Sequence, residues 1–319
     1  PVGDPTLLLT SAGMVQFKPF FAGEAEPPNP RLTSSQKSFR AVDIDEVGDA
    51  THLTLFEMLG NFSIGDYFKE GAVERALEFF DTAVGLPKER FAATVHYTDD
   101  EAFEIWKRVG IPEERIFRFG DEDNWWGPAG DEGVCGPSSE ISYYSGSLDD
   151  VPAVDDPVRN GVWGPNYHDD FVELYNLVFT QYYRDLDGND TVLPAKNIDT
   201  GMGFERMLAV LQGTPNVYET DVFQPIIARV EQLSGKEWGQ DEATDRAIRV
   251  VAEHAESKAV LSIALAVAAT RVAASLGENR HDFLAKRHCP RLGDSVDGHG
   301  EAEDLFADVD LDARRAVRA

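Results

Sequence analysis

The sequence N-I-D-T-G-M-G-F-E-R-M occupies residues Asn197 to Met207 and places two glycines, two acids and an arginine between two apolar runs. The residues before it are typical of a β-strand, and the apolar residues after it follow helical spacing up to a glycine. We therefore expect Gly201 and Gly203 at a strand-to-helix junction, where a missing Cβ permits positive φ or close approach of a ligand. Asp199 suits an ammonium group and Arg206 suits a phosphate or an aromatic face, so the stretch indicates a binding site.

Four further stretches carry, together with the first, a resemblance to a known family. Residues 197–206 resemble the third signature motif of class II aminoacyl-tRNA synthetases, in the form that alanyl-tRNA synthetases use. The other stretches resemble the same family in the same order, so that the resemblance runs from about residue 4 to about residue 255. They are D-P-T-L-L-L-T-S-A-G-M-V-Q-F-K (4–18), T-S-S-Q-K-S-F-R (33–40), F-E-M-L-G-N-F-S-I-G-D-Y-F-K (56–69) and C-G-P-S-S-E-I (135–141).

The order of the expected elements favours an α+β fold. Extended segments are expected over 6–17, 31–41, 91–97, 115–120 and 171–183, helices over 71–85 and 99–110, and helical sequence from about residue 221. The resemblance implies a class II synthetase-type antiparallel β-sheet flanked by helices, followed by the start of a helical domain. We expect an aminoacylation (adenylation) domain over 1–216, the start of a helical tRNA-recognition domain over 217–277, and an atypical tail that favours disorder over 278–319.

Composition narrows the class of protein. The chain has 319 residues, 42% hydrophobic residues and a formal net charge of −28, which argues against a nucleic-acid surface spread over the whole chain. Two cysteines are too few for a disulfide framework, and no run approaches the roughly 18 apolar residues that a membrane span needs. We expect a cytoplasmic location and no membrane. Because the resemblance starts within a few residues of Pro1, we expect a fragment that lacks an N-terminal helical segment.

The resemblance implies a set of ATP-binding residues. Arg40 matches the arginine that contacts the α-phosphate, and Arg206 matches the one that stacks on adenine against an aromatic residue of the 55–56 pair. Both are expected to act in catalysis, because phosphoryl chemistry needs charge neutralisation and positioning. The expected ATP contacts are Arg40, His52, Phe56, Glu140, Gly203 and Arg206. Glu140 is also the candidate ligand for Mg²⁺, since hard divalent ions prefer carboxylates near phosphates.

The resemblance likewise implies a pocket for alanine. Asp199 matches the carboxylate that binds the α-ammonium group, and Gly201 the backbone beside the small side chain. Trp126, Met58 and Asn176 are the other residues expected to line this pocket. Such a wall excludes larger side chains but discriminates poorly against glycine and serine. The expected substrates and partners are therefore alanine, ATP and tRNA(Ala), with the main tRNA-binding region beyond this sequence.

The sequence departs from the family pattern at several positions. Thr51 stands where an arginine precedes His52, and Leu55 stands where the first of two phenylalanines is usual. Ser138 replaces a second cysteine and Tyr175 a tryptophan. Of these changes, those at Thr51 and Leu55 put the activity of this chain in doubt, and that at Ser138 removes no obvious catalytic group. The spacing of His281, His288, Cys289 and His299 fits no closed site, so we expect no structural zinc.

Three functions remain open at this point. The motifs together favour an alanine–tRNA ligase core that forms alanyl-adenylate and passes alanine to tRNA(Ala). A homologue that activates a small amino acid for a different acceptor is slightly favoured by the acidic composition. A non-catalytic synthetase-like binding or regulatory domain is favoured by Thr51 and Leu55. A basic path from Arg40 and Asp199 toward the helical region distinguishes the first from the second.

Overall fold

The computed structural model describes residues 7, 9–153, 156 and 163–275, and these divide into two compact units. The first unit consists of residues up to Asp45 and from Ala50 to Thr220. The second consists of Glu46–Asp49 and the residues from Asp221 onward. The expected tail over 278–319 lies outside the described residues. The boundary expected at 216/217 stays a prediction.

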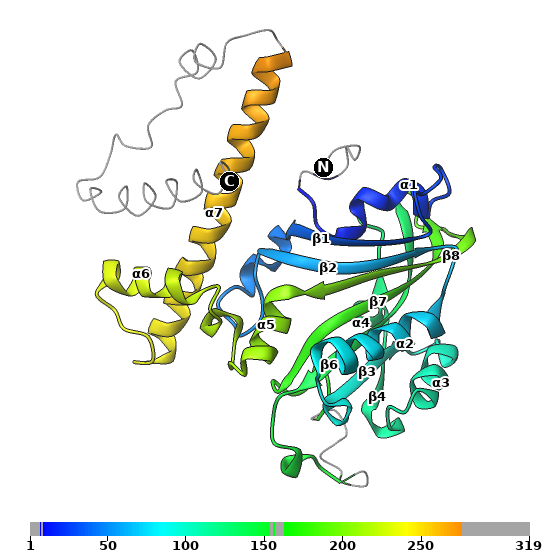
Figure 1. The fold of residues 1–319 in the computed structure, drawn as a ribbon, viewed down its shortest axis with the longest axis horizontal. Coiled ribbons are helices and arrows are strands. Elements are labelled where there is room, and N and C mark those ends of the chain that lie inside the picture. Colours follow the sequence, from blue (N-terminus) through cyan, green and yellow to red (C-terminus); the bar gives the residue numbers. More distant parts are fainter. Residues whose placement is uncertain (1–6, 8, 154–155, 157–162, 276–319) are drawn as a thin grey trace. The chain divides into compact units, whose positions relative to one another are not determined.

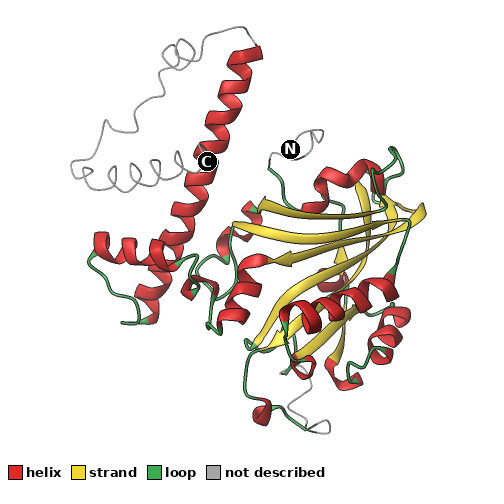
Figure 2. Ribbon diagram, in the orientation of Figure 1, coloured by secondary structure: helices red, strands yellow, loops and turns green. Residues whose placement is uncertain are grey.

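An eight-stranded sheet forms the first unit (Figures 1 and 2). Its strand order is β1-β2-β8-β7-β6-β3-β4, with β5 paired to β6. All pairs are antiparallel except β3 and β4. This sheet and its flanking helices confirm the expected fold class. The strands are β1 (Arg31–Phe39), β2 (Leu55–Ile64), β3 (Phe91–His96), β4 (Ile116–Phe119), β5 (Trp125–Trp126), β6 (Gly133–Tyr144), β7 (Phe171–Arg184) and β8 (Asp190–Gly203).

The helices of the first unit are α1 (Lys18–Phe21), α2 (Lys69–Glu78), α3 (Asp100–Arg108), α4 (Asp121–Asn124) and α5 (Phe204–Gln212). The expected helix over 71–85 is α2, which continues as a π-helical turn over Phe79–Val84 and ends at Gly85 with φ of 79°. A glycine tolerates this left-handed conformation without strain. The expected extended segment over 6–17 is wrong for its last part, since Gly13–Phe17 forms a 3₁₀ helix that buries Met14 and Val15.

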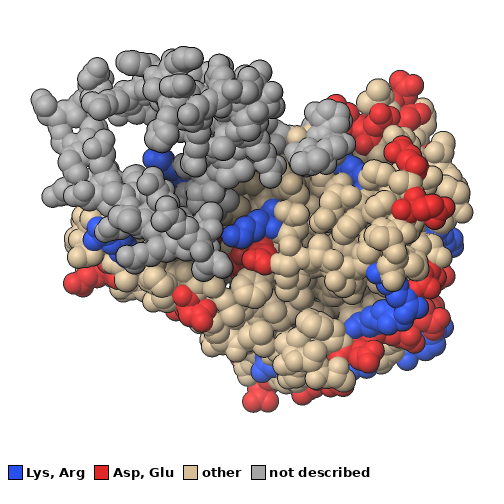
Figure 3. Space-filling model, turned by 45° about the horizontal axis from the view of Figure 1, so that its top comes forward, with Lys and Arg blue, Asp and Glu red and all other residues tan. Residues whose placement is uncertain are grey.

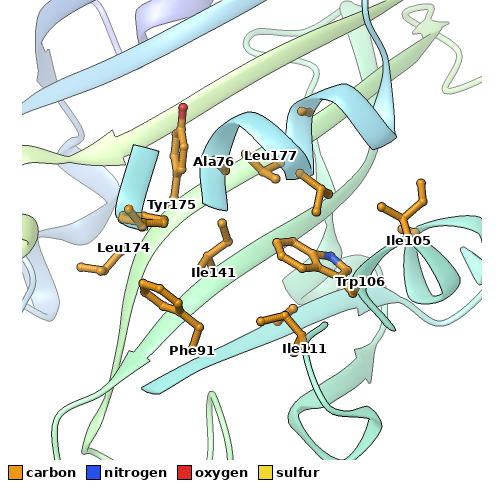
Figure 4. Close-up of a cluster of buried hydrophobic side chains, with 14 of the residues drawn as sticks. Ala76, Phe91, Ile105, Trp106, Ile111, Ile141, Leu174, Tyr175 and Leu177 are labelled. Carbon is orange, nitrogen blue, oxygen red and sulfur yellow. The ribbon is translucent and has the colours of Figure 1, made fainter. Parts of the chain in front are cut away.

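Helices α2 and α3 cover one face of the sheet. Figure 4 shows side chains of both helices meeting those of the strands, among them Ala76 and Trp106 from the helices and Ile141, Tyr175 and Leu177 from the sheet. Side chains alternate between the two faces of a strand, so the odd-numbered residues of β7 from Tyr175 to Phe179 enter this core. The even-numbered residues Asn176 and Val178 are left for the opposite face.

The two covering helices are also joined by buried charges. Lys69 of α2 lies 2.7 Å from the carboxylate of Asp99 and 3.0 Å from that of Glu101. Asp99 additionally caps α3 by accepting the backbone N–H of Ala102 at 3.0 Å. Because both Lys69 and Asp99 are buried, each needs the other as its partner.

The second unit contains the helices α6 (Gln224–Ser234) and α7 (Glu242–Ser275). They confirm that the sequence becomes helical after about residue 221. Arg249 of α7 donates to the carbonyl oxygen of Gly48 at 2.6 Å, which ties the short segment Glu46–Asp49 to this unit. Among the described residues, no helix combines the length and apolar character that crossing a membrane requires.

The charged surface is mixed on the face that Figure 3 presents. There, Lys and Arg side chains lie beside Asp and Glu side chains, and a large part of the face is uncharged. On this face, the Lys and Arg side chains of the described residues therefore form no extended basic surface of their own.

Candidate active site

One pocket of about 130 Å³ opens on the sheet face opposite to α2 and α3. It is lined by residues of β2, β5, β7, β8 and α5 and of the loop between β1 and β2. Ten of the eleven residues expected from the sequence line it. They are Arg40, His52, Phe56, Met58, Trp126, Asn176, Asp199, Gly201, Gly203 and Arg206.

Strand alternation explains why these residues converge. Asp199, Gly201 and Gly203 are every second residue of β8, so they share the pocket face. On the adjacent β7, Val178 pairs with Asp199 and Asn176 pairs with Gly201. Residues paired across antiparallel strands point to the same face, and the floor of the pocket is therefore set by the register of β7 and β8.

Gly201 serves the pocket by leaving space, not by an unusual backbone angle. A Cβ at this position would lie 2.9 Å from the Sδ atom of Met58. Met58 is held in place, because its Sδ accepts the backbone N–H of Gly13 at 3.4 Å. Trp126, from the short strand β5, provides the opposing aromatic wall. A side chain at position 201 would therefore have to displace Met58, which a glycine avoids.

Asp199 is a buried carboxyl at the floor of the pocket, with 5% of its surface exposed. Burial raises its pKa to about 7, and the positive charge of Arg40 opposes this shift. Since the net shift is upward, the charge of Arg40 does not fully offset the cost of burying the carboxylate. A cation that enters the pocket would stabilise the ionised form of this buried carboxyl group.

Arg40 lies at the end of β1 and faces the same pocket. Its Nε donates to the carbonyl oxygen of Ser11 at 3.0 Å, and its guanidinium carbon lies 5.3 Å from the centroid of the Phe56 ring. Burial lowers the pKa of Arg40, although the guanidinium remains charged in the physiological range. An anchored, partly desolvated cation is suited to an anionic ligand.

Arg206, in the first turn of α5, is fixed by three contacts. Its Nη1 donates to Glu173 Oε2 at 2.8 Å and to the carbonyl oxygen of Glu173 at 3.3 Å. Its Nε donates to the carbonyl oxygen of Thr51 at 3.4 Å. Thr51, which stands where the family has an arginine, thus supplies a backbone acceptor to Arg206, a residue of the pocket lining.

The Leu55 and Phe56 pair divides between the two sides of β2. Phe56 lines the pocket, whereas Leu55 is 7% exposed and is not among the lining residues. An aromatic ring is therefore present in the pocket despite the leucine at position 55. His52 also lines the pocket, and its carbonyl oxygen accepts the hydroxyl of Tyr218 at 3.2 Å.

Three carboxyl residues that line the pocket were missed by the sequence analysis, namely Asp43, Glu173 and Glu205. Glu173 partners Arg206, and Glu205 accepts the backbone N–H of Glu57 with oxygen distances of 2.9 and 3.2 Å. Burial raises the pKa of Glu205 to about 7. The sequence could have indicated Glu205, because this residue directly precedes Arg206. For Glu173 the indication is weaker, since it is only an acid between apolar residues at the start of β7.

Glu140 is the expected site residue that does not line the pocket. It pairs with Asn176 across β6 and β7 and accepts the Asn176 side-chain N–H at 3.3 Å, one strand away from the pocket floor. Burial, and then the charge of Glu173, raise its pKa to about 9. The described residues contain no group of three or more His, Cys, Asp and Glu side chains arranged for a metal ion. The residues His281, His288, Cys289 and His299 lie outside the part of the chain that is described.

Known proteins provide an independent comparison. The chain is 52% identical over 255 residues to a protein named alanine–tRNA ligase from Dehalococcoides mccartyi, covering 80% of this chain and 28% of that protein. It is 47% identical over 270 residues to the alanine–tRNA ligase of Rubrobacter xylanophilus, covering 82% of this chain and 30% of that protein. An apo histidyl-tRNA synthetase structure from S. aureus matches with 14% identity and a TM-score of 0.34, over 60% of this chain and 47% of that one.

The chain thus spans less than a third of the length of these two curated relatives. A family model described as tRNA synthetases class II (A) matches residues 1–268. This match covers most of the chain and includes every residue of the pocket. The chain therefore belongs to the class II (A) family of tRNA synthetases.

Proposed function

We propose that this chain contains the amino-acid-activating site of an alanine–tRNA ligase, which forms alanyl-adenylate and pyrophosphate from alanine and ATP. The observation that carries the proposal is that Asp199, Gly201 and Arg206 line one pocket together with Arg40 and Phe56. The carboxyl group of Asp199 suits an ammonium group, and the space beside Gly201 suits a small side chain. The two arginines suit the phosphates and the base of a nucleotide. The names of the two curated relatives support the same activity.

In this proposal the α-ammonium group of alanine binds the carboxylate of Asp199. The buried carboxylate lacks a full counter-charge, so the ammonium group supplies the compensation. The methyl group lies beside Gly201, where Met58 and Trp126 leave no room for a long side chain. Glycine and serine are poorly excluded by such a pocket, because one methyl or hydroxyl changes binding by only about 1–3 kcal/mol.

ATP occupies the part of the pocket between β2 and α5. Its adenine stacks between the ring of Phe56 and the guanidinium of Arg206, which Glu173 and Thr51 hold in place. Arg40 contacts the α-phosphate. One carboxylate oxygen of alanine attacks the α-phosphorus, the bond to the bridging oxygen breaks, and pyrophosphate leaves. Arg40 stabilises the negative charge that develops on the α-phosphate oxygens, and Asp199 keeps the attacking carboxylate in line.

Glu140 and Glu173 are the carboxyl groups proposed for Mg²⁺, and of the two only Glu173 lines the pocket. Glu140 and Glu173 repel one another, and their oxygen donors are of the type that Mg²⁺ prefers. With only two such groups, the remaining ligands have to be phosphate oxygens and water, which is common for Mg²⁺ bound with a nucleotide. When bound, the ion neutralises phosphate charge and orients the leaving pyrophosphate.

The transfer of alanine to tRNA(Ala) completes the proposed function. It is supported by the names of the relatives, of which this chain covers less than a third. The acidic composition supports the proposal that the main tRNA contacts are made outside this sequence. A cytoplasmic location is consistent with this activity and with the small number of cysteines.

Amino-acid-dependent exchange of pyrophosphate into ATP tests the activation step. The purified chain is assayed with Mg²⁺ and alanine, glycine, serine or phenylalanine. Exchange with alanine, weaker exchange with glycine and serine and none with phenylalanine supports the proposal. Absence of exchange with every amino acid, from a chain whose circular dichroism shows that it is folded, contradicts it and favours a binding domain.

A further inference from the structure

The pairing of β2 with β8 is interrupted beside the floor of the pocket. The two strands pair regularly on both sides of the interruption and in the same register, so neither strand has an inserted residue there. Between these regular parts, residues 60–62 and 199–201 form no regular pairs with each other. Asp199 and Gly201, which line the pocket, therefore lie where the ladder to β2 does not fix β8.

The side chain of Thr200 joins the two strands at this interruption. The backbone N–H of Asn61, which would reach a carbonyl oxygen in a regular ladder, donates to Thr200 Oγ1 at 2.8 Å. The Thr200 hydroxyl in turn donates to the carbonyl oxygen of Asn61 at 2.9 Å. One hydroxyl thus serves both backbone groups of Asn61.

Tyr175 of β7 holds the same hydroxyl from the other side. The two hydroxyl oxygens lie 3.0 Å apart, and both residues are buried. The Thr200 hydroxyl has one hydrogen, which goes to Asn61 because a carbonyl oxygen can only accept, so Tyr175 is the donor to Thr200. Tyr175 belongs to the core that α2 and α3 cover (Figure 4). The position of Thr200 is therefore fixed by the core as well as by β2.

The backbones of β2 and β8 also approach each other closely here. A Cβ at Gly60 would lie 2.5 Å from the carbonyl oxygen of Thr200. On the pocket face, a Cβ at Gly201 would lie 2.9 Å from the Sδ atom of Met58, which belongs to β2. The distance between β2 and residues 199–201 therefore decides how much space remains beside Gly201.

We propose that Thr200 is a positioning residue for the amino-acid part of the pocket. Held between β2 and β7, its hydroxyl fixes the positions of Asp199 and Gly201, its two neighbours in the chain. This inference rests on the proposed function, which assigns these two neighbours to the ammonium and methyl groups of alanine. Thr200 itself does not line the pocket, so it acts through them and touches neither alanine nor ATP.

Substitutions of Thr200 test the proposal in pyrophosphate exchange with alanine and ATP varied separately. Thr200→Val keeps the shape of the side chain and leaves buried groups of Asn61 and Tyr175 without their partner. The KM for alanine is expected to rise about tenfold or more, as when a binding group is displaced by a fraction of an ångström. The KM for ATP is expected to change little, because the contacts that hold Arg40 and Arg206 do not involve Thr200. Thr200→Ser keeps the hydroxyl and is expected to resemble the unsubstituted chain.

Ser63→Ala is the matched control for the loss of a buried hydroxyl. Ser63 lies in the regularly paired part of β2, and its hydroxyl donates to the carbonyl oxygen of Tyr67 at 2.7 Å. It does not line the pocket. Its substitution is expected to lower the melting temperature and to leave the KM for alanine unchanged.

Tyr175→Phe provides an independent variant should Thr200→Val fold poorly, which melting temperatures will show. It removes one of the hydrogen bonds of the Thr200 hydroxyl, so the KM for alanine is expected to rise about two- to fivefold. Because Tyr175 acts through that hydroxyl, no further rise is expected in the Thr200→Val background.

The outcomes separate this inference from the function on which it rests. A KM for alanine that is unchanged in folded Thr200→Val overturns the positioning role and leaves the proposed function intact. Equal rises in the KM for alanine and for ATP also overturn it, since a general distortion produces that pattern. A folded, unsubstituted chain that shows no exchange with any amino acid overturns both. A rise confined to alanine in Thr200→Val, and absent from Thr200→Ser and Ser63→Ala, supports the positioning role.

Discussion

The guanidinium of Arg206 is bound by Glu173, with Nη1 and Oε2 2.8 Å apart, although the two residues belong to different elements of the pocket. Arg206 lies in the first turn of α5, and Glu173 lies near the beginning of β7. The arginine is thus oriented before any nucleotide arrives. Pre-ordering of a side chain lowers the entropy that binding must overcome, so this ion pair should contribute to ATP affinity.

Glu173→Gln is expected to weaken ATP binding and to leave alanine binding unchanged. The substitution removes the charge that holds Arg206 but retains a similar shape. Since the Glu173 side chain is 41% exposed, the pair is worth about 1 kcal/mol or less, which corresponds to an increase of about two- to fivefold in KM for ATP. Exchange kinetics with ATP and alanine varied separately will check this. An increase confined to the KM for alanine would contradict the assignment of Arg206 to the nucleotide.

Asp199→Asn is expected to stabilise the ligand-free protein at alkaline pH while abolishing alanine activation. Burial raises the pKa of Asp199 from 3.8 to about 7, so between these pH values the folded state binds more protons than the unfolded state. The contribution of this group to stability therefore falls as pH rises, by an amount on the order of 4 kcal/mol above pH 7. Asparagine does not titrate, so the variant avoids this loss.

Melting temperatures at pH 5 and pH 8 measure the effect. The variant is expected to melt several degrees above the original chain at pH 8, since about 1 kcal/mol corresponds to roughly 2–4 °C in a protein of this size class. At pH 5, which lies between the two pKa values, the difference should be less than half as large. A lower melting temperature of the variant at both pH values would show that the carboxyl group stabilises the fold instead of the ligand complex.

Alanine activation should depend on the ionisation of Asp199. In the free enzyme, the ammonium group needs the carboxylate, and the pKa of about 7 predicts that kcat/KM for alanine rises as pH increases through this region. The profile of exchange rate against pH between 5 and 8.5 at low alanine concentration will report this value. A profile that is flat over this range would mean that Arg40 keeps Asp199 ionised throughout.

Gly201→Ala is expected to impair the activation of alanine more than the activation of glycine. The added Cβ would lie 2.9 Å from Met58 Sδ, so the side chain of Met58 has to move into the space for the substrate methyl group. We expect a loss of at least about tenfold in kcat/KM for alanine and a smaller loss for glycine. Gly203→Ala is the comparison, since its Cβ would meet only Arg206 atoms at 3.6 Å or more and should affect alanine less. An equal loss of kcat/KM for alanine and glycine in Gly201→Ala would show that the methyl group of bound alanine does not lie beside Gly201.

The sequence predicted most of the pocket because its residues lie on regular elements with a clear local pattern. The stretch from Asn197 to Met207 is a strand followed by a helix, as expected, and Gly213 ends that helix with φ of 65°. Alternation along β8 then fixed which residues share a face. The resemblance of the motifs around Arg40, Asp199 and Arg206 to one family predicted that the two arginines and the acid share one site, and all three line the pocket.

What the sequence did not reveal depends on contacts between distant residues. Glu173 and Glu205 acquire their roles from Arg206 and from the backbone of Glu57, and neither contact follows from a local pattern. Glu140 was expected to contact ATP or Mg²⁺, but strand pairing places it beside Asn176 on the neighbouring strand, outside the pocket lining. Leu55 departs from the family pattern, which the sequence showed. The sequence did not show which side of β2 each residue lies on, and in the structure Phe56 faces the pocket whereas Leu55 does not.

Binding of a non-hydrolysable alanyl-adenylate analogue tests most directly that one pocket accepts both alanine and ATP. Calorimetry with the alanyl sulfamoyl adenosine compound is compared for the unsubstituted chain, Asp199→Ala and Arg206→Ala. We predict tight binding to the unsubstituted chain, a large loss in each variant, and much weaker binding of the phenylalanyl analogue. Binding that survives both substitutions, or that does not distinguish the alanyl from the phenylalanyl compound, would contradict this account of the pocket.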